Sequence, residues 1–167
     1  MMLPREPAEK IVSREAARAF VRARQQSGQR VVFANGCFDI LHGGHVSYLN
    51  DARRRGDALV VGVNSDASER AIKGADRPIM ADAERAELIA GMEAVDRVVI
   101  FAEETAEACL RRIRPDVHAK GTDYTEQTVP EREIAEELGI EVVITGDPKT
   151  NASKQIIRTI QAGGDPG

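Results

Sequence analysis

Several apolar runs in this chain do not alternate with polar residues, and this feature constrains the fold most. The clearest run is Ala58-Leu59-Val60-Val61-Gly62-Val63. A strand that faces water on one side alternates apolar and polar residues, whereas a strand covered on both faces has a continuous apolar run. The runs therefore indicate buried strands of a parallel sheet. The expected strands are 31–34, 58–64, 97–101, 116–119 and 141–144.

Segments with helical periodicity separate these runs. We expect helices at 14–26, 45–55, 66–72, 82–92, 105–113, 130–138 and 153–162. The first has Ser13 as a capping residue and Gly28 just beyond its end. Strands that alternate with helices imply right-handed crossovers and parallel pairing. We therefore predict an α/β fold, a Rossmann-like doubly wound parallel sheet of about five strands, with ligands bound beyond the carboxyl ends of the strands.

The length of 167 residues suits one domain. We expect a single domain over 1–167, with 1–10 as a loose, proline-containing lead. The formal net charge is −4, with acidic and basic residues interspersed, which argues against a nucleic-acid partner.

The cysteines and apolar segments indicate the compartment. Cys37 and Cys109 form neither a C-x-x-C pair nor a zinc-finger spacing, which favours a reducing environment. The first residues lack the apolar core of a signal peptide, and no later apolar run approaches the roughly 18 residues of a membrane helix. We expect a cytoplasmic protein without a membrane partner.

Two histidines and two glycines, His42-Gly43-Gly44-His45, lie where the strand at 31–34 gives way to a helix. The first N–H groups of a helix lack partners, and its dipole places partial positive charge there, so this junction favours anions. His42 and His45 are three residues apart and share one side of the first turn. Gly44 allows phosphate oxygens close to the main chain. The junction predicts a nucleotide triphosphate site.

A metal pair is the main alternative for these histidines. A metal ion held by His42 and His45 would need a third ligand, and the remaining histidine, His118, ends a different expected strand. We therefore predict no metal ligand among the protein side chains, and we expect His118 to be a pocket or packing residue.

The residues around this junction resemble the H-x-G-H nucleotidyltransferase superfamily, in its cytidylyltransferase-like branch. The branch carries a motif of the form G-x-F-D-x-x-H-x-G-H, and the matching residues here are Gly36, Phe38, Asp39, His42, Gly44 and His45. Later segments resemble successive signatures of adenylyltransferases that act on D-glycero-β-D-manno-heptose 1-phosphate. These segments are 63–66, 73–74, 77–79 and 115–124. The likeness extends over about 10–160.

The resemblance implies transfer of AMP from ATP to a sugar 1-phosphate, with release of pyrophosphate. Mg²⁺ would accompany ATP and bridge its phosphate oxygens. The acceptor phosphate attacks the α-phosphorus in line, so the protein supplies positioning and charge stabilisation rather than a nucleophile. His42, His45 and Lys73 would stabilise the charge. A homodimer is expected by analogy alone.

The resemblance also assigns nucleotide contacts. They fall on Asn35, Gly36, Cys37, Phe38, Asp39, Gly44, Lys120, Gly121 and Asp123. Asn35 and Asp39 are also common turn formers, because their side chains bond nearby backbone N–H groups. Cys37 lies beside a helix N-terminus, but nothing in the sequence pairs it with a base.

Three further residues have both functional and structural interpretations. Lys73, beside Gly74 in an expected polar loop, either is solvated or neutralises phosphate. Asp66 either caps the helix at 66–72 or helps to form the substrate pocket. Arg77, held extended before Pro78, is a weaker candidate for a substrate contact.

The last signature departs from the family pattern. Related cytidylyltransferases have an I-S-T-T run before the final helix, whereas this chain has Asn151-Ala152-Ser153-Lys154. Ser153 can cap the helix and Lys154 can supply charge, so both are nucleotide-binding candidates. Which phosphate each would contact stays open.

Two alternative functions share the scaffold. One is a cytidylyltransferase acting on glycerol 3-phosphate or another small phosphate, because residue types alone do not set the choice of base. The other is a nucleotide-binding module without turnover, which the altered last signature allows.

Overall fold

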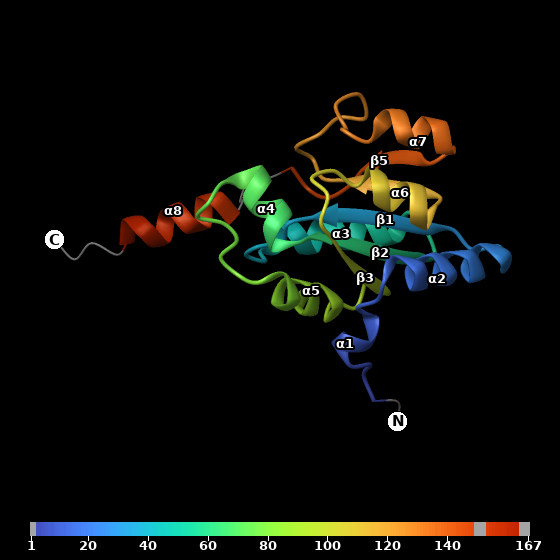
Figure 1. The fold of residues 1–167 in the computed structure, drawn as a ribbon, viewed down its shortest axis with the longest axis horizontal. Helices are drawn as coiled ribbons and strands as arrows, with labels where there is room; N and C mark the ends of the chain where they lie inside the picture. The colour runs from blue at the N-terminus through green and yellow to red at the C-terminus, as the bar shows by residue number, and fades with distance from the viewer. Residues whose placement is uncertain (1–2, 149–152, 164–167) are drawn as a thin grey trace.

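The computed structural model describes residues 3–148 and 153–163 and contains a five-stranded parallel sheet (Figure 1). The strands are β1 (Val31–Gly36), β2 (Ala58–Asn64), β3 (Arg97–Phe101), β4 (Val117–Lys120) and β5 (Glu141–Ile144). Their order is β3-β2-β1-β4-β5, and all the pairings are parallel. The predicted doubly wound α/β fold is therefore confirmed. The winding changes direction between β1 and β4, which is the switch point where such folds bind ligands.

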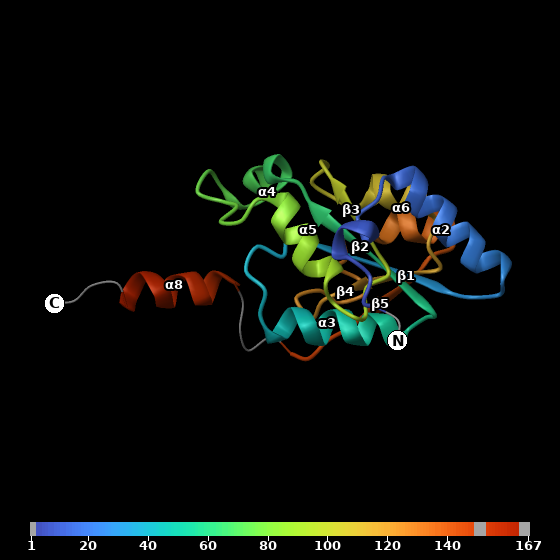
Figure 2. The same ribbon diagram turned by 90° about the horizontal axis from the view of Figure 1, so that it is seen from below.

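Helices cover both faces of the sheet. They are α1 (Pro7–Lys10), α2 (Arg14–Gln26), α3 (Gly43–Arg54), α4 (Asp66–Lys73), α5 (Asp82–Ala90), α6 (Glu107–Ile113), α7 (Arg132–Leu138) and α8 (Ser153–Gly163). Apolar residues of α3 and α5 share one core with Val32 and Ala34, while those of α2, α6 and α7 share a second core with Val31 and Phe33. Figure 2 shows α3 and α2 on opposite sides of the sheet. Burial on both faces explains why β1 and β2 lack alternation.

The N-terminal segment differs from the expected loose lead. Residues 7–10 form α1, with Pro7 in the first turn, where its missing N–H costs nothing. The helix packs against α5, and Lys10 Nζ donates to the Met92 carbonyl at 3.3 Å. The next helix follows the prediction, because Ser13 Oγ accepts from Ala16 N at 3.1 Å and begins α2.

The last described helix, α8, extends away from the sheet (Figures 1 and 2). None of its residues is buried. Among the described residues, no helix combines the length and the apolar character needed to cross a membrane.

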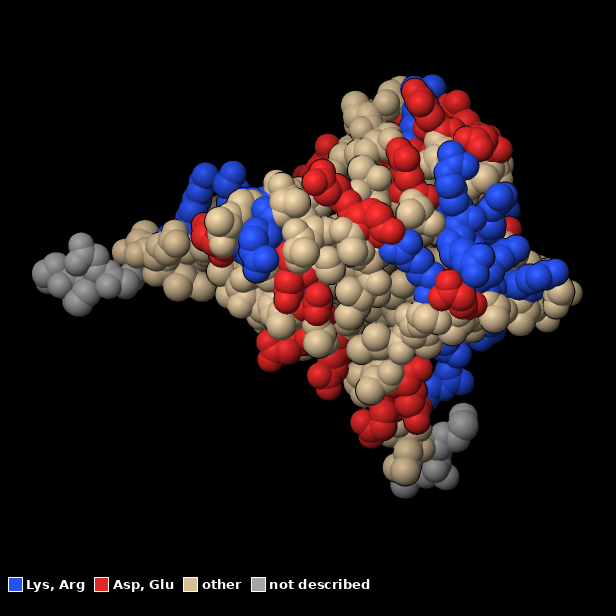
Figure 3. All heavy atoms as spheres, in the orientation of Figure 1, with Lys and Arg blue, Asp and Glu red and all other residues tan. Residues whose placement is uncertain are grey.

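Basic side chains gather over α2 and α6 on the face drawn in Figure 3. Arg18 lies on α2, and burial together with the charges of Arg22, Arg114 and Arg112 lowers its pKa. Elsewhere on this face acidic and basic side chains are mixed, as the sequence indicates.

Candidate active site

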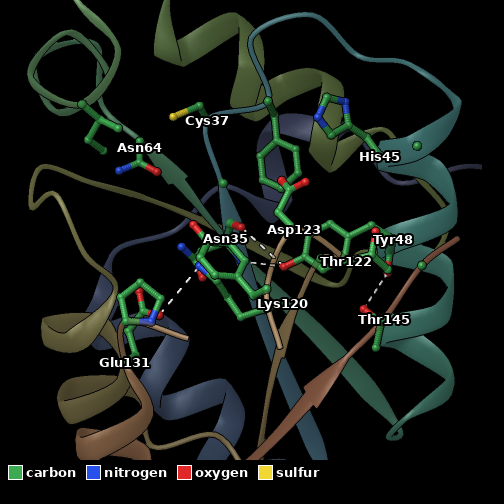
Figure 4. A pocket seen from close by; sticks show the side chains of 18 of the residues that line it. Asn35, Cys37, His45, Tyr48, Asn64, Lys120, Thr122, Asp123, Glu131 and Thr145 are labelled. Carbon is green, nitrogen blue, oxygen red and sulfur yellow. Dashed lines mark hydrogen bonds and ion pairs between the residues drawn. The ribbon is translucent and has the colours of Figure 1, made fainter. Parts of the chain in front are cut away.

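A cavity of 390 Å³ lies at the carboxyl ends of β1, β2, β4 and β5. Asn35 comes from the end of β1, Asn64 from β2 and Lys120 from β4, while Thr145 follows β5 (Figure 4). The cavity therefore occupies the edge at which a parallel sheet binds ligands. The predicted site residues that line it are Asn35, Gly36, Cys37, Phe38, Gly44, His45, Lys73, Lys120, Gly121 and Asp123.

The two motif histidines form a reciprocal cap at the start of α3. His42 is the N-cap residue, and its Nδ1 accepts from Gly44 N at 3.1 Å. His45 Nδ1 accepts from His42 N at 3.3 Å, and the ring centroids lie 4.0 Å apart. The two rings thus share one side of the first turn, as the spacing predicts. A neutral ring that accepts at Nδ1 carries its proton on Nε2, so Nε2–H is the donor of each imidazole.

His45 lines the cavity, whereas His42 does not belong to its described lining. The helix begins at Gly43, two residues before the expected start, because the His42 side chain supplies the cap. His42 therefore orients the first turn that carries His45.

Phe38 has a backbone conformation that is rare for a residue with a side chain. Its φ is 52°, in the left-handed region. Its ring lies edge-on to His45 with centroids 5.3 Å apart and is stacked with Tyr48 at 6.5 Å. Tyr48 is buried and donates to the Ala119 carbonyl at 2.7 Å, and its burial raises the pKa of its hydroxyl. Tyr48 was not among the residues predicted from the sequence, although its spacing of three from His45 places it on the same helix.

Asp39 and Arg77 do not belong to the described lining of the cavity. Arg77 Nε donates to Asp39 Oδ2 at 2.7 Å, and the same carboxylate accepts from Ile79 N and Met80 N, each at 2.8 Å. Burial alone would raise the pKa of Asp39, but these hydrogen bonds outweigh it and lower that pKa. In the structure the pair joins the loop after β1 to residues 77–80.

Glu69 and Arg85 extend this pair into a buried network that the sequence analysis did not identify. Both side chains are fully buried, and Arg85 Nη1 lies 3.2 Å from Glu69 Oε2. Arg77 Nη2 lies 3.4 Å from Glu69 Oε1. Burial and the nearby Asp39 raise the pKa of Glu69 to about 6, although the charges of Arg85 and Lys73 oppose the shift. Arg85 also donates to the Cys37 carbonyl at 2.6 Å, so the network fixes both residues that flank Phe38.

Asp66 belongs to the same network rather than to the described lining of the cavity. Its Oδ1 accepts from Asp82 N at 2.7 Å and from Arg85 Nη2 at 3.0 Å, which ties α4 to α5. Of the two roles considered for Asp66, helix capping is wrong, because the N-cap is Ser65, whose hydroxyl accepts from Ser68 N. Serine accommodates the extended N-cap backbone and leaves Asp66 inside the first turn.

Lys73 is exposed and lines the cavity, as its proposed contact with phosphate requires. It is the last residue of α4 and not part of a loop, because the helix continues to Gly74, whose φ of 113° ends it. Cys37 lines the same cavity, and burial raises the pKa of its thiol even though Lys73 opposes the shift. The thiol therefore stays protonated at neutral pH.

The β4 side of the cavity is built on a buried histidine. His118 packs against Phe33 with ring centroids 5.9 Å apart, and its Nε2 lies 3.0 Å from Asn35 Oδ1. Burial lowers the pKa of His118 to about 4, so the ring is neutral at pH 7. His118 is thus a packing residue that orients Asn35. Lys120 Nζ lies 3.7 Å from Glu131 Oε2, and Glu131 is another cavity residue that sequence analysis missed.

The altered last signature is only partly described. Asn151 and Ala152 lie outside the described residues. Ser153 is the first residue of α8, and its hydroxyl donates to the Ile40 carbonyl at 2.9 Å, which differs from the expected capping role. Lys154 is exposed, and neither residue belongs to the described lining of the cavity.

Comparisons with known proteins agree with this geometry. The model of a family described as cytidylyltransferase-like matches residues 33–159. The "Bifunctional protein HldE" of Geotalea uraniireducens is 47% identical over 156 residues, which cover 92% of this chain and 31% of that protein. The protein of the same name from Pseudomonas aeruginosa PAO1 is 47% identical over 137 residues, which cover 82% of this chain and 29% of that protein. The chain thus spans about a third of the length of these relatives.

A solved structure is also similar. It is described as the lipopolysaccharide core biosynthesis protein from Thermoplasma volcanium GSS1, and it superposes with a TM-score of 0.63 at 29% identity. The match covers 73% of this chain and all of that one.

Proposed function

Because the chain belongs to the cytidylyltransferase-like family of nucleotidyltransferases, we propose that it transfers AMP from ATP to D-glycero-β-D-manno-heptose 1-phosphate. The products are ADP-heptose and pyrophosphate. The observation that carries the proposal is the convergence of His45, Lys73 and Lys120 on one cavity at the switch point of the sheet. The acceptor is inferred from the segments that resemble heptose 1-phosphate adenylyltransferases. The similarity to a lipopolysaccharide core biosynthesis protein is consistent with it.

The triphosphate binds at the N-terminus of α3 in this proposal. The helix dipole favours anions there, and His45 Nε2–H donates to a phosphate oxygen. Lys73 neutralises charge that develops as the acceptor oxygen attacks the α-phosphorus and pyrophosphate leaves. The buried network around Arg85 holds the loop that carries Phe38, and Phe38 in turn contacts His45. Positioning and electrostatics therefore account for the reaction without a covalent intermediate on the enzyme.

Mg²⁺ would accompany ATP in this proposal and would shield the charge of the phosphate oxygens. Among the described residues, no group of three or more His, Cys, Asp or Glu side chains is arranged to hold a metal. An ion bound together with substrate phosphates would need only one or two protein carboxylates, so such a group is not required here. Asp123 and Asp147 line the same cavity, and their carboxylates would help to hold the ion there.

Pyrophosphate release tests the proposal. The purified protein is incubated with Mg²⁺ and either ATP or CTP, together with heptose 1-phosphate, glycerol 3-phosphate or no acceptor. We expect pyrophosphate only with ATP and heptose 1-phosphate, and an ADP-heptose product by mass spectrometry. A preference for CTP and glycerol 3-phosphate would establish the cytidylyltransferase alternative. Nucleotide binding without pyrophosphate under any condition would indicate a non-catalytic module.

We also propose a cytoplasmic location, where ATP is plentiful, and a homodimer. Light scattering on the purified protein measures the assembly directly, and a monomer mass would refute the dimer.

A further inference from the structure

One lobe of the cavity, which we call the β4 lobe, has a chemistry that phosphate binding does not explain. It is lined by Asn35, Lys120, Tyr124 and Glu131. Figure 4 shows Glu131 on the opposite side of the cavity from His45, with Asn35 between them. The lobe therefore lies away from the end of the cavity where the helix dipole and His45 favour phosphate.

Glu131 carries an acceptor without a donor. The residue is 2% exposed, and its Oε1 accepts from Ala106 N at 3.0 Å, which fixes the carboxylate. Its Oε2 has no hydrogen-bond partner among the described residues, and Lys120 Nζ, at 3.7 Å, is beyond hydrogen-bonding distance. A buried acceptor without a donor is costly. Because Glu131 lines the cavity, a bound ligand can supply the missing donor.

The carboxylate is ionised at neutral pH. Burial alone would raise the pKa of Glu131, but Lys120 and other neighbours outweigh burial and lower it. An ionised carboxylate at this position repels phosphate and favours hydroxyl or amine donors.

Asn35 and Lys120 place donors beside this acceptor. Asn35 Oδ1 is occupied by His118, whose Nε2 must donate because a carbonyl oxygen only accepts. The amide NH₂ is therefore the group that Asn35 presents to the cavity. The Lys120 ammonium lies 4.7 Å from the centre of the Tyr124 ring, so an aromatic surface adjoins the polar groups.

We propose that the β4 lobe is a sugar-hydroxyl subsite, in which Glu131 Oε2 accepts from one hydroxyl while Asn35 and Lys120 donate to its neighbour. Neighbouring hydroxyls suit this arrangement because each one both donates and accepts. The C–H face of a sugar ring can pack on Tyr124. The inference rests on the proposed function for its source of hydroxyls, which is either the acceptor sugar or the ribose of the nucleotide.

Replacing one oxygen of the Glu131 carboxylate with an NH₂ group tests the subsite. Glu131→Gln keeps a side-chain oxygen for Ala106 N and replaces Oε2 with an NH₂ group. The matched control is Glu133→Gln, which makes the same charge change at an exposed position on the first turn of α7. Steady-state kinetics are measured with heptose 1-phosphate and ATP, with monodeoxy analogues of the acceptor, and with 2′-deoxy-ATP and 3′-deoxy-ATP.

We expect Glu131→Gln to raise the KM of one substrate by about 10-fold or more, with a smaller change in kcat. A deoxy analogue that lacks the bonded hydroxyl should have a similarly raised KM with the wild type. With the variant, the same analogue should have nearly the same KM as the full substrate. Sensitivity to the acceptor analogues identifies the acceptor sugar, and sensitivity to the deoxy-ATPs identifies the ribose. A purely structural role of Glu131 would not produce this loss of discrimination.

Three results would overturn the subsite. The first is a Glu131→Gln variant that matches Glu133→Gln in both KM values. The second is an equal loss of activity of Glu131→Gln with every substrate and analogue, accompanied by a lower melting temperature. The third is a raised KM for ATP but not for inosine triphosphate, which would assign the lobe to the adenine amine. If the wild type shows no turnover, calorimetric titration of ATP, the deoxy-ATPs and heptose 1-phosphate into both variants still decides the subsite, while the proposed function alone fails.

Discussion

Replacing Asp39 with Asn should destabilise the protein strongly, although the motif suggests a role in nucleotide binding. The Asp39 carboxylate is 1% exposed and accepts from Arg77 Nε, Ile79 N and Met80 N. Asn retains one acceptor oxygen, so at least one buried donor loses its partner and the charge of Arg77 loses its closest counter-ion. Breaking a buried ion pair on one side costs about 3–5 kcal/mol. In a domain of this size that loss corresponds to a fall of about 10 °C in melting temperature.

Urea and thermal unfolding of Asp39→Asn measure this cost. The matched control is Asp76→Asn, which changes an exposed acid in the neighbouring loop and should stay within about 0.5 kcal/mol of the wild type. Asp39→Asn should also lose turnover below its melting temperature, because Phe38 is then held on one side only. A variant as stable as the wild type but inactive would refute this reasoning and return Asp39 to a direct role at the nucleotide.

Three further predictions concern single side chains. His45→Asn should leave the fold intact, with a loss of about 1 kcal/mol at most from the weakened cap of α3. It should reduce turnover by about 100- to 1,000-fold, since a preorganised donor to the transition state is lost; near-normal turnover would contradict it. Lys73→Ala should weaken substrate or transition-state binding without lowering the melting temperature, because an exposed lysine contributes little to folding; a large loss of stability with unchanged kinetics would show a structural role. His118 has a pKa of about 4 in the fold, against about 6.5 when unfolded. As the pH falls, His118 is therefore protonated in the unfolded chain before it is protonated in the folded protein. The free energy of unfolding should decrease as the pH drops from about 6.5 towards 4. Urea titrations at several pH values measure this decrease, which should be smaller in His118→Gln than in the wild type. An equal dependence of the free energy of unfolding on pH in both proteins would refute the prediction.

The sequence alone determined the sheet and the edge of the sheet at which the cavity lies. The boundaries of β2, β3 and β5 agree with the apolar runs, because each of these strands is bounded by polar residues or turns. The placement of the cavity follows from topology, since parallel strands direct all their carboxyl ends to one edge. The capping role of Ser13 was also readable, because a helix cap acts over only a few residues.

Contacts between distant residues were decided only by the tertiary structure. Asp39 meets Ile79 across 40 positions, and Asn35 meets His118 across 83. A motif gives the identity of such residues but not the partners that occupy their polar atoms. Asp39 and Arg77 therefore look like cavity residues in the sequence but lie in the buried network in the structure, and the partly exposed Asp66 is joined to that network through Arg85.

Glu131 is the converse case, because it lines the cavity although nothing in its sequence context indicates this. In the sequence it is one of several glutamates in 131–137, and its exposed neighbour Glu133 looks equivalent. Only the packing of α7 against α6 brings its carboxylate to Ala106 N and Lys120. Periodicity and local capping depend on residues a few positions apart, so the sequence determines them. The environment of an ionisable group depends on which elements pack around it, and that is fixed only when the chain has folded.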